Sequence, residues 1–137
     1  MTTPSNTSKT ARKHLAPSPE HPIVITPATT RVVVRANGRT IADTRNALTL
    51  CEASYPPIQY IPRNDVDMSR LTPTTHHTYC PYKGDASYYS ITDLGKAGEN
   101  VIWTYNSPFD AVEPIATYLA FYAERVDSID TSERLVD

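Results

Sequence analysis

Residues 78–90 concentrate side chains that can do chemistry. This stretch holds the thiol of Cys80, the amine of Lys83 and several tyrosine hydroxyls, and His76 lies just before it. A hydrophobic core does not need this mixture of polar groups, because each buried polar atom must find a partner. The sequence therefore indicates a binding or catalytic site here, but it does not specify a reaction.

Cysteine chemistry is the sharpest catalytic hypothesis. On an extended strand His76, Thr78 and Cys80 share one face because side chains alternate, and Lys83 follows closely. A nearby imidazole and cation favour the thiolate, so Cys80 would be the nucleophile and His76 the base. In the competing interpretation Cys80 is a small buried residue and Lys83 is solvated, and we favour it because free cysteine is commonly buried. Whether the protein is an enzyme stays open.

A non-covalent ligand site is the preferred function of the same region. Small-molecule sites combine aromatic walls with a few convergent polar groups. The aromatic candidates are Tyr60, Tyr88, Tyr89, Trp103 and Tyr105. The polar candidates are Glu52, Arg63, His76 and Lys83, of which Lys83 suits an anionic ligand. We predict a cleft between sheets that binds a small molecule through Lys83, Glu52, Arg63, Tyr60, Tyr88 and Trp103. A core role for most of these aromatics, and a structural role for Lys83 in its turn, are the alternatives.

Metal chemistry has weaker support. A structural zinc site needs four cysteine or histidine ligands, usually in close pairs, whereas Cys51 and Cys80 are far apart. A catalytic zinc held by Glu52, His76 and Cys80 would take its ligands from unrelated positions. We predict no metal and no cofactor.

The composition excludes several classes of partner. The chain has 137 residues, which suits one domain, and a net charge of -2 without a basic stripe, so we expect no nucleic acid. No apolar run approaches the ~20 residues of a membrane span, and no apolar leader opens the sequence. We expect a cytoplasmic protein, either monomer or homodimer. A protein-interaction module without a small ligand is the third functional alternative.

Turn signals divide the chain into short strands. Proline is frequent, at 12 residues, and tyrosine numbers 9, which favours β structure over helix. Asn37-Gly38 is the strongest hairpin signal because a type I′ turn needs positive φ at both central residues. The strands are predicted at residues 31–36, 39–43, 47–52, 58–61, 76–80, 86–92 and 99–105. Ser107-Pro108 predicts the start of one short helix near 108–115.

The predicted domain spans residues 23–127. Residues 1–22 are rich in Thr, Ser and Pro and predict a disordered tail, and residues 128–137 predict a frayed end. Residues 115–126 fit both a helical stripe and a buried strand, so the pattern alone does not choose between them. The fold class is all-β and mainly antiparallel, as an open barrel or sandwich.

An ordered series of motifs resembles the family called domain of unknown function 427, sometimes named nucleotidyltransferase-like. The series covers residues 31–127 and includes Tyr55-Pro56-Pro57, Tyr60-Ile61-Pro62-Arg63-Asn64-Asp65-Val66, Cys80-Pro81-Tyr82-Lys83-Gly84, Ala86-Ser87-Tyr88-Tyr89-Ser90, Trp103-Thr104-Tyr105 and Ala120-Phe121-Tyr122. The chain departs from the usual family pattern at Cys51 and His77.

The resemblance implies a curved antiparallel domain of the β-tent type, in which the run near Tyr118 is a strand. It implies no settled activity. Nucleotidyl transfer would need carboxylates that hold Mg²⁺ and a backbone loop that holds the phosphates. Asp65 and Asp67 have a suitable spacing, but no phosphate loop precedes them, so the family name alone does not support that reaction.

Overall fold

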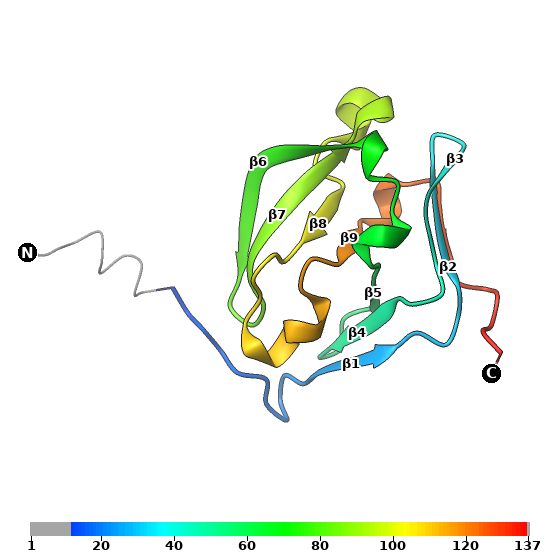
Figure 1. Ribbon diagram of the computed structural model, residues 1–137. Helices are drawn as coiled ribbons and strands as arrows, with labels where there is room; N and C mark the ends of the chain where they lie inside the picture. The colour runs from blue at the N-terminus through cyan, green and yellow to red at the C-terminus, as the bar shows by residue number, and fades with distance from the viewer. Residues whose placement is uncertain (1–11, 137) are drawn as a thin grey trace, which may run out of the picture.

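The computed structural model describes residues 12–136, and strands dominate them (Figure 1). The strands are β1 (Ile23–Pro27), β2 (Val32–Ala36), β3 (Arg39–Thr44), β4 (Leu48–Glu52), β5 (Ile58–Tyr60), β6 (Leu71–Cys80), β7 (Gly84–Ile91), β8 (Ile102–Thr104), β9 (Leu119–Phe121) and β10 (Ser128–Asp130). The 3-10 helices are η1 (Arg63–Asp65), η2 (Met68–Arg70), η3 (Thr92–Gly98), η4 (Asp110–Ile115) and η5 (Ala123–Arg125). None of the described residues forms a helix that could span a bilayer.

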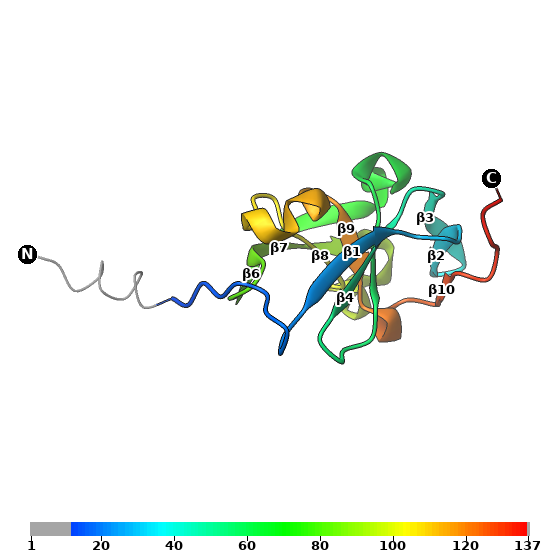
Figure 2. The same ribbon diagram turned by 90° about the horizontal axis from the view of Figure 1, so that it is seen from below.

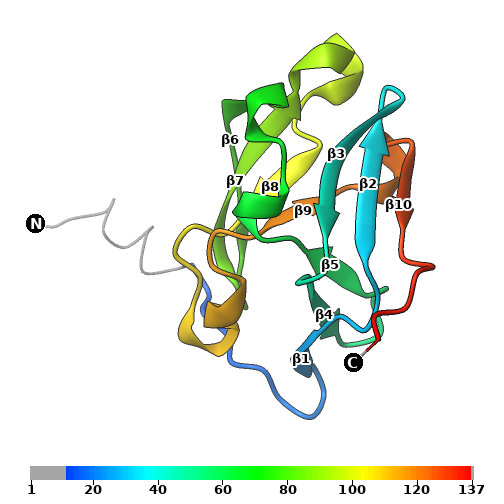
Figure 3. The same ribbon diagram turned by 45° about the vertical axis from the view of Figure 1, so that its right-hand side comes forward.

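All strand pairings between these elements are antiparallel, and they form three sheets. The strand orders are β1-β4-β5, β10-β2-β3 and β6-β7-β8-β9. Figure 3 shows β3, β2 and β10 side by side, away from β6 and β7. Because strands dominate and pair antiparallel, the predicted all-β antiparallel class is confirmed. The sheets are not closed into a barrel. The finer β-tent type stays a prediction.

The Asn37-Gly38 hairpin forms as predicted. Both residues have positive φ, 54° and 72°, as a type I′ turn requires, and β2 pairs with β3 directly across the turn. Local turn chemistry was therefore enough to locate this hairpin.

Strands β8 and β9 are buried on both faces and separate two hydrophobic clusters. Ile102, Leu119 and Phe121 pack into the first cluster, together with β2 and β3 residues such as Val34. Trp103 and Ala120 alternate with them and point into the second cluster. The side-chain alternation of two short strands therefore supports two cores, and the second core holds most of the buried aromatic residues.

Residues 115–126 contain a strand rather than a helix. β9 pairs with β8 in the register Trp103↔Ala120, which confirms the strand that the family resemblance implied. The expected helix near 108–115 is the 3-10 helix η4, in which Pro114 lies inside the helix. Pro114 lacks a backbone N–H, so a longer α-helix is disfavoured there.

The N-terminal segment differs from the sequence prediction. Residues 1–11 of the predicted tail lie outside the described residues. Residues 12–22, which we call the strap, run along the ends of β6 and β7 before β1 begins (Figure 2). The Leu15 N–H donates to the Pro81 carbonyl at 2.9 Å, and the His14 ring stacks on Phe109 with centroids 3.7 Å apart. The local composition predicted disorder, and it could not reveal these contacts because their partners lie far away in the sequence.

The C-terminal segment also differs. Residues 128–137 were expected to fray, but β10 pairs with β2 in the register Ile129↔Val34. Ile129 is half-buried against the first hydrophobic cluster. A strand of three residues with one apolar side chain carries too weak a sequence pattern to be recognised.

The pairing of β10 predicts that Ile129 stabilises the fold. Ile129→Ala should lower the free energy of unfolding by about 1–2 kcal/mol, because it removes part of a half-buried side chain from the core. Ser128→Ala, at an exposed position of the same strand, should change it by less than about 0.5 kcal/mol. Urea unfolding of both variants measures the difference, and equal, negligible effects would mean that β10 does not dock.

Candidate functional site

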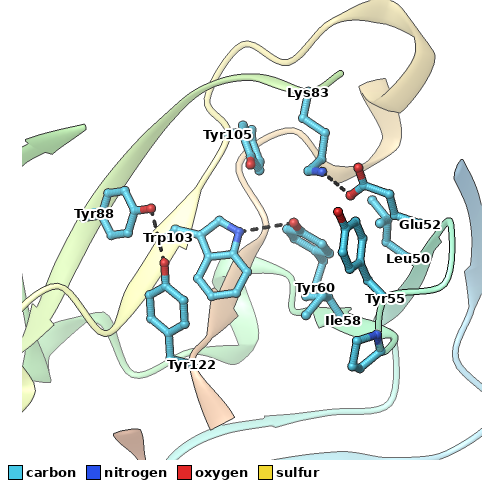
Figure 4. Close-up of a pocket in the computed structure, with 11 residues that line it drawn as sticks. Leu50, Glu52, Tyr55, Ile58, Tyr60, Lys83, Tyr88, Trp103, Tyr105 and Tyr122 are labelled. Carbon is cyan, nitrogen blue, oxygen red and sulfur yellow. Dashed lines mark hydrogen bonds and ion pairs between the residues drawn. The ribbon is translucent and has the colours of Figure 1, made fainter. Parts of the chain in front are cut away.

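A cavity of about 340 Å³ opens between β4–β5 on one side and β7–β8 on the other (Figure 4). This volume lies at the lower end of the range that small-molecule sites occupy. Its lining residues are Leu50, Glu52, Tyr55, Pro56, Ile58, Tyr60, Lys83, Tyr88, Trp103, Tyr105 and Tyr122. The cavity therefore has mainly aromatic walls and one charged pair.

Side-chain alternation delivers most of this lining. Leu50 and Glu52 lie two residues apart on β4, and Ile58 and Tyr60 lie two apart on β5. Because residues i and i+2 face the same side of a strand, each strand contributes its inward face. Trp103 and Tyr105 have the same spacing, and so have Ala120 and Tyr122.

The aromatic wall is fixed by ring contacts and hydrogen bonds. The Trp103 Nε1–H donates to the Tyr60 hydroxyl at 3.2 Å, and the two rings are nearly perpendicular, with an interplanar angle of 89°. Tyr122 packs on the other side of Trp103, with centroids 4.6 Å apart. The hydroxyls of Tyr122 and Tyr88 lie 3.4 Å apart, so a chain of contacts holds the indole in place.

Lys83 reaches the cavity from the turn between β6 and β7. Its backbone carbonyl accepts from the Phe109 N–H at 3.0 Å, and Gly84 after it has a φ of +110°, which other residues rarely adopt. Only 7% of Lys83 is exposed. A lysine this buried requires a compensating charge, because an isolated ammonium is costly to remove from water.

Glu52 supplies that charge. Its Oε1 accepts from Lys83 Nζ at 2.5 Å, and its Oε2 lies 2.7 Å from Nε2 of His21. Burial raises the pKa of the Glu52 carboxyl, but the hydrogen bonds from Lys83 and His21 together outweigh burial and hold the pKa below its ordinary value of 4.5. Glu52 is therefore ionised at neutral pH and forms a true ion pair with Lys83.

The tyrosine hydroxyls around the pair are neutral. Burial raises the pKa of Tyr60 and of Tyr105, and burial together with the Tyr88 hydrogen bond raises the pKa of Tyr122 to about 12. In Figure 4 the hydroxyls of Tyr55 and Tyr60 lie on the side of the cavity where Lys83 and Glu52 meet. One end of the cavity is thus polar and carries no net charge from these side chains.

The structure brings together most of the residues predicted for the site. Glu52, Tyr60, Lys83, Tyr88 and Trp103 all line the cavity, and so does Tyr105 among the other aromatic candidates.

Arg63 and Tyr89 do not line the cavity. They pair with each other instead, because Arg63 Nη1 donates to the Tyr89 hydroxyl at 3.0 Å. Tyr89 follows Tyr88 on β7, so its side chain points to the opposite face and packs against the first hydrophobic cluster.

The predicted catalytic pair is not assembled. The His76 ring is exposed and packs edge to face with Tyr88, with centroids 4.6 Å apart. Cys80 is half-buried against the second hydrophobic cluster. Within residues 12–136 no hydrogen bond joins the two side chains, and neither lines the cavity. His76 and Thr78 both contact Tyr88, so they share a face of β6 as predicted. However, His76 and Cys80 are four residues apart on an extended strand, which separates them by roughly 13 Å, too far for a hydrogen bond between their side chains.

Sequence reasoning missed several lining residues, namely Leu50, Tyr55, Pro56, Ile58 and Tyr122. The i, i+2 spacing from Glu52, Tyr60 and Ala120 could have found three of them, Leu50, Ile58 and Tyr122. His21 was assigned to the disordered tail, and no local signal marks its contact with Glu52. Among the described residues, no three His, Cys, Asp or Glu side chains gather as ligands for a metal ion.

The fold and the cavity define a small antiparallel β domain with an aromatic-lined cavity between two sheets. The chain belongs to the family described as Domain of unknown function (DUF427), whose model matches residues 24–132, as the sequence motifs predicted. The comparison with curated proteins finds no match.

The pKa of Glu52 predicts how pH affects stability. Because the folded-state pKa lies below 4.5, ionised Glu52 stabilises the fold above that pH, and this stabilisation is lost as the pH falls through the folded-state pKa. Glu52→Gln should lower the free energy of unfolding by about 1–3 kcal/mol at pH 7, since it leaves Lys83 without its counter-charge. The gap between variant and wild type should close below pH 4.5.

Urea unfolding at a series of pH values measures this gap. Glu113→Gln is the control, because Glu113 is exposed and makes no ion pair within residues 12–136. A gap that stays constant from pH 7 to pH 3 would contradict the role given to the Glu52 charge.

The exposure of the two cysteines predicts their order of alkylation. Cys51 is exposed and Cys80 is half-buried, so iodoacetamide at neutral pH should label Cys51 first. Mass spectrometry of peptides from a time course measures both rates, and Cys51→Ser should leave one slow site. Faster labelling of Cys80 would restore the nucleophile hypothesis.

Proposed function

We propose that this domain binds a small, planar, uncharged molecule in the cavity between its sheets. The observation that carries the proposal is the ion pair of Lys83 and Glu52, which is largely buried at one end of an aromatic cavity. The ligand would place a flat ring against Trp103 and a polar edge against the pair.

The walls favour a flat apolar body. Trp103 and Tyr60 meet almost at right angles, and Leu50 and Ile58 complete the apolar surface. Aromatic rings gain from edge-to-face and offset contacts with a further ring, beyond the area that they bury. A volume of about 340 Å³ admits one substituted ring rather than a long or branched ligand.

The charges favour a neutral polar edge. An anionic group beside Lys83 would also lie beside Glu52, and like charges at short distance repel strongly in a poorly solvated site. A carboxamide avoids this cost, because its carbonyl accepts from the Lys83 ammonium while its N–H donates to the Glu52 carboxylate. The anionic ligand expected from Lys83 alone is therefore not the ligand that we propose.

A cationic ligand is the nearest alternative. Aromatic cages bind ammonium groups, and Glu52 adds a carboxylate to this one. However, Lys83 Nζ already lies 2.5 Å from that carboxylate, so a second cation would meet the same repulsion from Lys83. The proposal therefore places the neutral ligand first.

Three probes of nearly identical shape test the charge preference: benzamide, benzoate and benzamidinium. Trp103 is the sole tryptophan of the chain and lines the cavity, so its fluorescence reports binding directly. We expect benzamide to bind with Kd on the order of 1 mM, the range for a fragment, and both ions to bind at least tenfold more weakly. Ligand-observed NMR gives an independent Kd.

Matched variants show whether the Lys83–Glu52 ion pair binds the polar edge of the ligand. The double variant Lys83→Met/Glu52→Gln removes both charges together and should weaken the binding of benzamide about tenfold. Lys96→Met removes an exposed lysine outside the cavity and should leave the Kd unchanged. Tighter binding of benzoate or benzamidinium would overturn the neutral ligand, and absence of binding by all three probes would overturn the proposal.

A further inference from the structure

The strap places His21 beside the Glu52 carboxylate, at the oxygen that Lys83 does not contact. It is docked by the Arg12–Asp85 ion pair at 2.7 Å and by the stacking of His14 on Phe109. Near its end, the backbone groups of Ser18 and His21 hydrogen-bond to each other, at 3.0 and 3.2 Å. These contacts form a local turn, and the His21 ring lies against Glu52, whose other carboxylate oxygen meets Lys83 in Figure 4.

His21 is held on two sides. Its ring stacks on Tyr82, with centroids 4.0 Å apart and planes at 5°, and its Nε2 lies 2.7 Å from Glu52 Oε2. Tyr82 precedes Lys83 in the turn between β6 and β7. One histidine of the strap therefore contacts both segments that form the ion pair.

We infer that His21 is a positioning residue of the cavity, which fixes the Glu52 carboxylate so that Glu52 in turn orients Lys83. The part of this inference that concerns ligand affinity rests on the proposed function, whereas the part that concerns Glu52 does not.

The physical reason lies in the two oxygens of the carboxylate. Lys83 holds Oε1 and His21 holds Oε2, so the carboxylate has no freedom to rotate about its last bond. Without His21, Oε2 loses its partner and the group can turn, which moves the acceptor that a ligand N–H would meet. A polar site displaced by a fraction of an ångström loses affinity because its hydrogen bonds lengthen.

The inference predicts a specific pattern among strap variants in the full-length protein. His21→Ala should raise the pKa of Glu52, because one of the two hydrogen bonds that lower it is lost. The same variant should weaken the binding of benzamide about tenfold. His21→Gln keeps an N–H donor, so it should reverse much of the rise in the Glu52 pKa and much of the loss of benzamide affinity.

His14→Ala is the matched control. His14 also stacks on an aromatic ring of the domain, but it makes no contact with the ion pair within the described residues. It should lower stability as much as the loss of one stacking contact does, without changing the pKa of Glu52. The pKa is measured by carboxyl ¹³C NMR of the Glu52 side chain across a pH titration.

The outcomes separate the two proposals. An unchanged Glu52 pKa in His21→Ala, with a loss of stability equal to that of His14→Ala, would overturn the role of His21. A raised Glu52 pKa supports the positioning role even if no probe binds the wild type, and in that case only the proposed ligand fails. A raised pKa with weakened benzamide supports both.

Discussion

The burial of the Lys83 ammonium is the constraint on which the rest of the site depends. A turn between β6 and β7 directs this side chain inward, where only 7% of the residue remains exposed. Such a charge is tolerated only beside an opposite charge with further hydrogen bonds. Glu52 supplies this charge from the end of β4, and His21 of the strap contacts the second oxygen of its carboxylate. The ion pair and the His21 contact together therefore connect three segments that are distant in sequence.

The two-faced burial of β8 and β9 explains why a cavity can exist in so small a domain. Their side chains alternate between two clusters, so the first cluster, which contains Val34 and Ile102, packs the fold independently of the second. The second cluster is built from large aromatic rings that meet at steep angles, as Trp103 and Tyr60 do. The cavity lies among these rings, because the aromatic side chains that meet edge to face also form its walls.

An ion pair without net charge in an aromatic cavity also serves stability, and that role is compatible with the ligand binding that we propose. Removing one partner is costly because the other charge stays buried, so the pair is maintained whether or not a ligand is present. What distinguishes a binding site from a purely structural pair is the open volume beside it, about 340 Å³, with neutral tyrosine hydroxyls around its polar end. The combination of open volume and polar side chains at one end is the basis of the ligand proposal.

Local sequence patterns were sufficient to predict the features that depend on neighbouring residues. Asn37-Gly38 located a hairpin because only such residues tolerate two positive φ angles, and the apolar and aromatic runs located most strands. The residue types expected of a small-molecule site also identified five residues of the cavity, namely Glu52, Tyr60, Lys83, Tyr88 and Trp103.

Which of these side chains meet depends instead on how distant segments pack together. Glu52 and Lys83 are 31 residues apart, and their contact depends on how the β4 end lies against the β6–β7 turn. The same packing turned Arg63 toward Tyr89 and left His76 outside the cavity. It also docked the strap that composition predicted to be disordered. Contacts of this kind are set by the free energy of the whole packed fold, and no local pattern in the chain records them.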